Sequence, residues 1–148
     1  MLFLLFQIGK DRYGLAANQV VEIVPLVQMK KIPRAPAGVA GIINYHGVPV
    51  PVIDLTEITS NQPSSRRFST RTILVRYPAD QEGARLLGLM AEKATQTLQL
   101  DPAAFVNPGI TGKETPYLGP VIQDDKGFIQ WIETKTLLPD SLRDLLLP

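Results

Sequence analysis

Cysteine is absent from the 148-residue chain, and histidine occurs once, as His46. Without cysteine the protein cannot form disulfides, thiolate zinc sites, iron–sulfur clusters or a cysteine nucleophile. The absence also fits a reducing compartment. A zinc site usually takes three or four His, Cys or carboxylate ligands, and one imidazole falls far short of that set. The sequence therefore predicts no metal site.

An excess of charge of one sign is also absent, since 15 basic side chains face 14 acidic ones for a net charge of +1. Nucleic-acid binding usually depends on a basic face, so we expect no nucleic-acid partner. The densest basic cluster, SSRRFSTR at residues 64–71, is typical of a solvated connector, with a phosphate-binding patch as the alternative.

Long hydrophobic runs are missing as well, and none approaches the roughly 20 residues that cross a bilayer. The opening stretch MLFLLFQIG has neither a positively charged start nor a small-residue cleavage site, so it differs from a signal peptide. It predicts a first strand instead. We expect a soluble protein that does not insert into a membrane and stays in the compartment where it is made.

No catalytic set is recognisable. A hydrolase triad is not indicated, because no G-x-S-x-G motif surrounds a serine and His46 sits beside Gly47 in an expected turn. Asp54 follows an apolar strand, where its side chain is expected to bond nearby backbone N–H groups. Neither a G-x-G-x-x-G motif nor a complete P-loop is present. The sequence therefore predicts that the protein is not an enzyme.

What the chain does have is scattered proline and glycine, 13 and 11 residues respectively, which favour short strands and turns over long helices. Strands are expected at 2–8, 13–17, 20–24, 40–45, 48–54, 71–77, 117–123 and 128–132. The stretch ARLLGLMAEKATQTLQL, residues 84–100, has helix-forming residues, but we interpret it as two strands hinged near Glu92 and Lys93.

Nine or ten short strands at this spacing indicate barrels or a sandwich, and we favour a mainly β fold of two small packed β-barrels. The polar stretch at 59–70 is expected to be the linker. It would divide the chain into a first subdomain at about 1–62, with C-terminal residues as a candidate addition, and a second at about 63–138. A short helix is expected near the C-terminus, capped by Ser141 in a capping box with Asp144, and its leucines 142, 145 and 146 should face the protein body.

The stretch GIINYHGVPVPVIDL, residues 41–55, predicts a hairpin whose turn contains His46 and Gly47. Glycine takes a positive φ without steric cost, which suits such a turn. Pro49 and Pro51 lie two residues apart and so direct their missing N–H groups to the same side. One edge of this strand should therefore be unpaired or lie at a rim.

Several motifs in the same order resemble the coupling proteins of the CheW family and the CheW-like regulatory domain of the histidine kinase CheA. The stretches FQIGKDRYGLAANQVVEIV, IPRAPAGVAGIINYHGVPVPVIDL, LLGLMAEKATQTLQL and FIQWIETKTLL carry the likeness along nearly the whole chain. The resemblance implies one CheW-like domain, built of two five-stranded SH3-like barrels, without catalysis or cofactor.

The resemblance also implies a function: an adaptor in chemotaxis signal transduction. Its partners would be the cytoplasmic domain of a methyl-accepting chemoreceptor and the regulatory domain of a CheA-type kinase. The expected location is cytoplasmic, at the inner face of the membrane in receptor arrays. A small-ligand sensor or carrier on the same barrels is the alternative, with Tyr13, Tyr45 and Trp131 as candidate lining and core packing as the other interpretation of Trp131.

By the same resemblance, receptor binding is assigned to a groove between the barrels. Its residues would be Val20, Gly41, Asn44, His46, Gly47, Gly88 and Met90. For the glycines an interface role and a purely local backbone role are both open, and the substitution Gly41→Arg is expected to weaken receptor binding with little loss of thermal stability. The family usually has arginine where His46 stands, and imidazole lacks the permanent charge and donor fork of a guanidinium.

Overall fold

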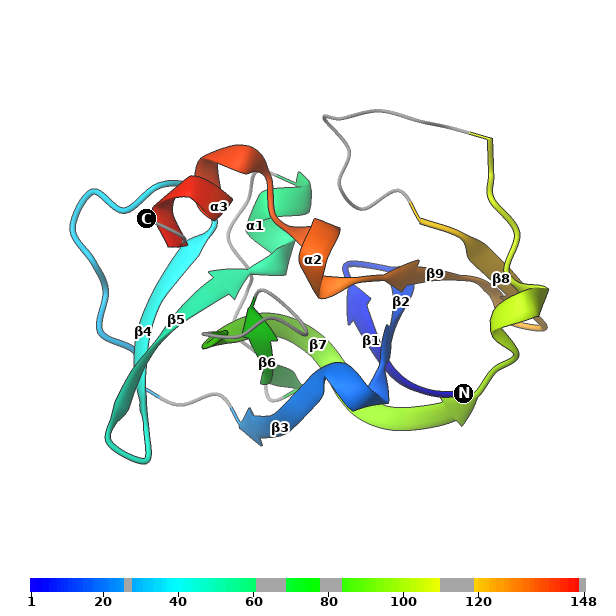
Figure 1. Cartoon of the computed structure of the whole chain (residues 1–148), viewed down its shortest axis with the longest axis horizontal. Coiled ribbons are helices and arrows are strands. Elements are labelled where there is room, and N and C mark those ends of the chain that lie inside the picture. Colours follow the sequence, from blue (N-terminus) through cyan, green and yellow to red (C-terminus); the bar gives the residue numbers. More distant parts are fainter. Residues whose placement is uncertain (26–27, 61–68, 78–83, 110–118, 147–148) are drawn as a thin grey trace.

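The computed structural model describes residues 1–25, 28–60, 69–77, 84–109 and 119–146 of the chain. The described residues form nine strands in one continuous sheet, with short helices between them, so the predicted mainly β class is confirmed (Figure 1). The strands are β1 Leu2–Ile8, β2 Asp11–Ala16, β3 Val20–Pro25, β4 Val39–Tyr45, β5 Val48–Asp54, β6 Thr70–Tyr77, β7 Arg85–Gln99, β8 Val121–Asp124 and β9 Gly127–Ile132. The α-helices are α1 Leu55–Ser60, α2 Thr134–Leu137 and α3 Asp140–Leu146, and single 3-10 turns are η1 Ala17–Gln19 and η2 Pro102–Ala104.

The first barrel consists of β3, β6, the first half of β7, β5 and β4, on the left of Figure 1. β6 pairs antiparallel with both β3 and β7, and β5 pairs with β4 and, in parallel, with β7. A bridge between Lys30 and Ile42, with two hydrogen bonds of 2.9 Å, joins the chain after β3 to β4 and closes the ring. Closure matters because it leaves no long free sheet edge.

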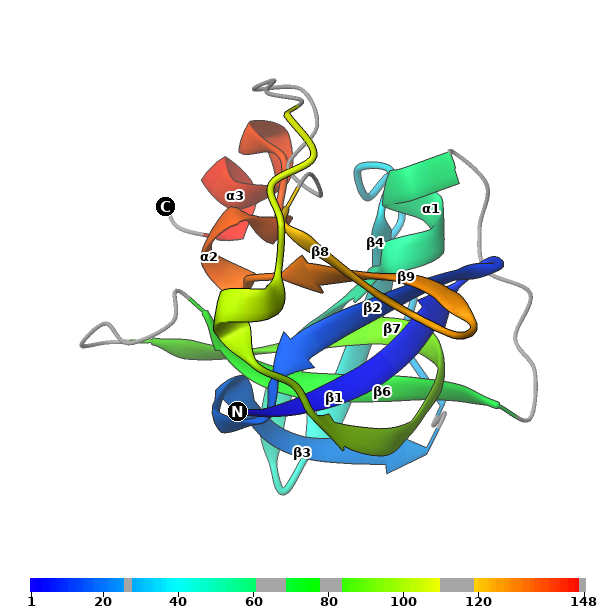
Figure 2. The same ribbon diagram turned by 90° about the vertical axis from the view of Figure 1, so that its right-hand side faces the viewer.

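The second barrel consists of the second half of β7, β1, β2, β9 and β8 (Figure 2). β1 pairs antiparallel with β7 and with β2, while β2 runs parallel to β9. A bridge between Val106 and Val121 connects the segment after β7 to β8. The two predicted barrels are thus both present, and β7 is a wall of each.

β7 changes barrels at the place where the sequence predicted a hinge. Lys93 has φ of +52°, and the register with β1 shifts beside Glu92, which pairs with strands of both barrels. The Glu92 carboxylate accepts hydrogen bonds from Ser69 Oγ at 2.7 Å and Thr70 Oγ1 at 2.6 Å. The choice of strand over helix is confirmed, but the segment is one bulged strand instead of two separate ones.

Strand pairing crosses the predicted division near residue 62, since β7 pairs with β1 on one side of that boundary and with β6 on the other. The division into 1–62 and 63–138 stays a prediction for the units in which the chain folds. Of the predicted linker, residues 61–68 lie outside the described part, and residues 59–60 belong to α1, which the sequence did not predict.

The larger hydrophobic cluster joins the barrels to the C-terminal helices. It combines β1 and β2 side chains such as Phe6 and Leu15 with Ile73 of β6 and with Leu142 of α3, all at most 2% exposed. Burying each such side chain contributes roughly 2 kcal/mol, so the barrels are expected to move as one body. A smaller cluster fills the first barrel around Met29 and Met90.

The predicted C-terminal helix is confirmed, but two of its details are wrong. α3 begins at Asp140, and the carbonyl of Pro139 accepts the first helical bonds, so Ser141 lies within the first turn and forms no capping box. Leu142 is buried as expected, whereas Leu145 is 55% exposed. The side chain of Leu146 lies outside the described set.

Candidate functional site

The hairpin of β4 and β5 forms as predicted and projects from the first barrel at the lower left of Figure 1. Tyr45 pairs with Val48, which leaves His46 and Gly47 as a two-residue loop. Their φ angles of +51° and +86° are those of a type I′ turn. Asn44 Oδ1 accepts a hydrogen bond from Gly47 N at 2.7 Å and holds the loop in place. Asn44, His46 and Gly47 are all exposed, so the tip is a preformed polar surface.

Aromatic side chains stiffen this tip. The rings of Tyr45 and His46 meet edge to face with centroids 4.5 Å apart. Tyr45 also packs against the smaller core cluster, and a hydrogen bond with Glu22 of β3 raises the pKa of its phenol. The imidazole is therefore held against a ring that is itself anchored to the barrel.

Gly41, Gly88 and Met90 lie in the barrel wall, away from the hairpin tip. Gly41 pairs with Val52, which in turn pairs with Gly88, so the two glycines share one row across three strands. Both glycines are buried, and Met90 is 2% exposed within the smaller core. Val20, at the start of β3, is half-buried against the larger core. A single groove formed by these residues and the tip stays a prediction.

The space around Gly41 contradicts the expected tolerance of Gly41→Arg. Its φ is +153°, and an added Cβ would lie 2.6 Å from the carbonyl oxygen of Lys30. At Gly88 an added Cβ would lie 2.8 Å from Thr72 Cγ2 and 3.0 Å from Val52 Cγ2. Both glycines are therefore required by packing, and substitutions there disturb the barrel before they disturb any partner.

An open groove of about 470 Å³ lies beside the hairpin. One wall comes from the start of β5, the other from the start of β7, and Tyr77 and Leu145 contribute from β6 and α3. β5 pairs with β7 only from Val52 onward, so the edge at Pro49 and Pro51 is unpaired as predicted. The sequence did not indicate that α3 contributes to this groove, because Leu145 was expected to point inward.

Asp54 has the local role that was expected of it. Its side chain is 2% exposed, and Oδ1 accepts hydrogen bonds from the backbone N–H groups of Thr56 at 3.0 Å and Glu57 at 3.3 Å. These are the free donors of the first turn of α1. The carboxylate therefore starts a helix that follows β5 directly.

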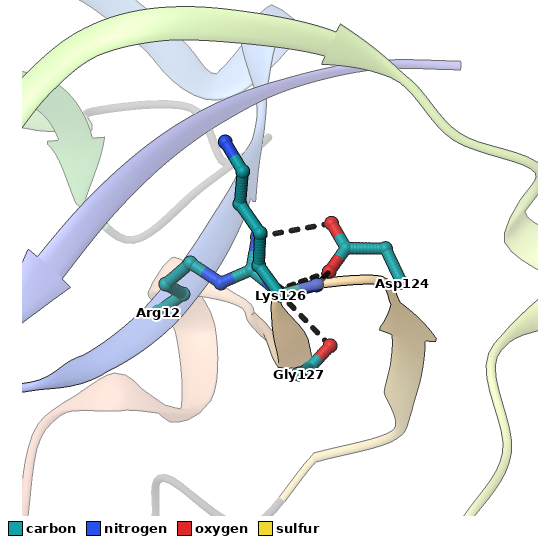
Figure 3. A network of polar contacts seen from close by, with 4 residues as sticks. All are labelled: Arg12, Asp124, Lys126 and Gly127. Atoms are coloured by element: carbon teal, nitrogen blue, oxygen red, sulfur yellow. Dashed lines mark hydrogen bonds and ion pairs between the residues drawn. The ribbon is translucent and has the colours of Figure 1, made fainter.

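An ion pair clamps the second barrel (Figure 3). Arg12 donates to both Asp124 oxygens, at 3.0 and 2.5 Å, and to the carbonyl of Gly127 at 3.0 Å, while Lys126 N donates to Asp124 at 2.8 Å. These donors lower the pKa of Asp124 to about 2. The pair ties the turn of β8 and β9 to β2. No sequence signal indicated it, because the partners are 112 positions apart.

Several alternatives for the site find no support. Within the described residues no group of three or more His, Cys, Asp or Glu side chains could hold a metal ion. Tyr13 stacks on Phe6, and Trp131 packs on Phe3 and Phe105, so neither converges with Tyr45 on one cavity. Among the described helices none is long and apolar enough to cross a membrane.

Comparison with known proteins shows one consistent family. The model of the CheW-like domain matches residues 2–141. The chemotaxis protein CheW of Klebsiella aerogenes is 31% identical over 98 residues, covering 66% of this chain and 56% of that protein. Protein FrzA of Myxococcus xanthus is 24% identical over 110 residues, which cover 74% of this chain and 66% of FrzA. The alignments thus span less than two thirds of these relatives.

A solved structure agrees with the sequence comparisons. The crystal structure of the scaffolding protein TtCheW from Thermoanaerobacter tengcongensis is similar with a TM-score of 0.78 and 26% identity. The structural alignment covers 92% of this chain and 86% of the TtCheW chain. The likeness therefore extends over both barrels.

Proposed function

Because the chain belongs to the CheW-like domain family, we propose that it is a non-catalytic adaptor that couples chemoreceptor cytoplasmic tips to a CheA-type histidine kinase. The observation that carries the proposal is the family match over residues 2–141 together with the double-barrel fold shared with a scaffolding protein. Its place of work would be the cytoplasm, at the inner face of the membrane within receptor arrays.

The physical properties of the fold suit an adaptor. Two partners are held at a fixed distance only if the body between them is stiff. Here β7 runs through both barrels, and one hydrophobic cluster joins them to α2 and α3. The hydrogen bonds of Glu92 to Ser69 and Thr70 fix the point where β7 changes barrels.

We assign receptor binding to the first barrel. The exposed tip residues Asn44, His46 and Gly47 would contact the receptor directly, and Val20 at the start of β3 is a further candidate contact. Gly41, Gly88 and Met90 would act indirectly, by shaping the wall that carries the tip. Polar groups on a rigid turn are suited to set the register of a partner, while buried anchors supply most of the affinity.

The test is the binding of a receptor cytoplasmic fragment to the variant His46→Gly, compared with Lys10→Ala in the turn between β1 and β2. Glycine accepts the φ of +51° at position 46, so this change removes the imidazole without adding strain. We expect receptor binding to weaken by about five- to thirtyfold, or about 1–2 kcal/mol, as for an interface side chain below the hot-spot range, with kinase binding unchanged. Equal receptor affinity of the two variants would refute the role of the tip, and failure of the folded wild type to bind either partner would refute the adaptor.

A further inference from the structure

The wall of the first barrel is open between the beginnings of β5 and β7. The two strands pair in parallel only where Val52–Asp54 meets Gly88–Met90. The three residues before each segment do not pair with each other, and both stretches line the groove. Pro49 and Pro51 explain this, since neither has an N–H group to donate toward β7. Among the described residues, alternate backbone groups of residues 85–87 on that side therefore have no strand partner, although β6 pairs with their other side.

The groove at this opening is mainly apolar. Val48 and Leu145 are 49% and 55% exposed, and they are among the few large hydrophobic side chains exposed in the described part of the chain. Pro49, Pro51 and Leu86 continue the same surface. Binding by strand addition uses two features: unpaired backbone groups that form hydrogen bonds, and a neighbouring apolar surface that contacts alternate side chains. This groove has both.

Two polar side chains face the groove. Tyr77 lines the groove and is 4% exposed. Burial raises the pKa of Tyr77, so its hydroxyl stays protonated and able to donate. Arg85 is exposed and is the one charged residue in the described lining, without an ion pair in the described chain. A phenol donor and a guanidinium together favour an occupant that carries a carboxylate.

We propose that this opening receives an extended, acidic-apolar segment of a signalling partner, which adds as a strand along the free side of residues 85–87. Alternate side chains of the segment would cover Val48, Pro51 and Leu145, and a carboxylate would meet Arg85 and Tyr77. The partner's identity as a signalling protein rests on the proposed function, but the binding mode does not.

The experiment uses two synthetic probes on the full chain: a capped hexapeptide of alternating valine and glutamate, and the same peptide with lysine in place of glutamate. NMR titration is the measurement. We expect saturable shifts of the amide signals of residues 77 and 84–87 with the glutamate peptide and not with the lysine peptide. No such shifts up to millimolar peptide, or equal shifts with both peptides, would overturn the proposal.

Substitutions test whether the charge of Arg85 and the missing N–H groups of Pro49 and Pro51 are responsible for peptide binding. Arg85→Gln should weaken binding of the glutamate peptide by about two- to fivefold, the loss typical of an exposed ion pair. Arg76→Gln, on the neighbouring strand β6, should leave this affinity unchanged. The double variant Pro49→Val with Pro51→Val restores both N–H groups, so β5 can pair with β7 and close the opening. We expect it to lose peptide binding without a lower melting temperature; full peptide binding in a folded double variant would contradict the proposal. Because the probes are synthetic, these results do not depend on whether a receptor or kinase binds.

Discussion

The substitution Gly41→Ala tests how the first barrel is closed. Gly41 has φ of +153°, and an added Cβ would lie 2.6 Å from the Lys30 carbonyl oxygen and 3.2 Å from Met29 Cβ. The near neighbour is backbone, so it cannot rotate away as a side chain could. Relief of the clash would move Lys30, whose N–H and C=O form the two 2.9 Å hydrogen bonds to Ile42.

The expected loss can be worked from these contacts. A non-glycine residue in this φ region costs on the order of 1–3 kcal/mol in backbone strain. Weakening the two backbone hydrogen bonds between Lys30 and Ile42 adds about 1–3 kcal/mol. We therefore expect Gly41→Ala to lower the free energy of unfolding by about 2–6 kcal/mol, a large part of the roughly 5–15 kcal/mol typical of a domain.

The assay is equilibrium urea unfolding followed by circular dichroism, with Gly47→Ala as the matched control. Gly47 also has positive φ, at +86°, but no atom lies within 4 Å of its added Cβ. The variant Gly47→Ala should therefore lose only the free energy that backbone strain costs, about 1–2 kcal/mol. If the two variants lose the same free energy, the close approach of Lys30 to Gly41 does not limit the barrel, and the reasoning is wrong.

Two further predictions concern the core and the clamp. Thr72 Oγ1 is buried and has no hydrogen-bond partner among the described residues, so Thr72→Val should raise the free energy of unfolding, measured in urea, by about 0.5–2 kcal/mol. A lower free energy of unfolding in the variant would contradict this prediction. Arg12 lowers the pKa of Asp124 from 3.8 to about 2, so the pair stabilises the fold above pH 3.8 and that contribution is lost as the pH falls toward 2. Asp124→Asn should reduce this acid-induced loss in urea unfolding at pH 5 and pH 2, and an unchanged pH dependence would count against the clamp.

Local chemistry allowed the hairpin to be predicted from the sequence. Gly47 supplied a turn residue, and Pro49 and Pro51 removed the donors from one edge, so both the turn and the open edge followed from three residues. A hinge between two strands was predicted near Glu92, where the apolar pattern breaks, and the structure has a bulge of the single strand β7 at that place. In each of these cases the responsible residues are neighbours in the chain.

The features that could not be predicted depend on residues distant in sequence. The Arg12–Asp124 pair joins positions 112 apart and leaves no local pattern. Gly41 and Gly88 were assigned to a surface by resemblance, which does not report burial, and their close packing appears only when three strands meet. Leu145 follows the buried Leu142 by three residues, a spacing that predicts burial on the same helix face. It is exposed because α3 ends beside the groove that Leu145 lines.

The most direct test of the adaptor is whether one molecule binds both partners at once. Sedimentation velocity should be measured for the protein mixed with a receptor cytoplasmic fragment, with a CheA-type regulatory domain, and with both. We predict a ternary complex that sediments faster than either binary one. Two binary complexes that compete and never combine would contradict the account.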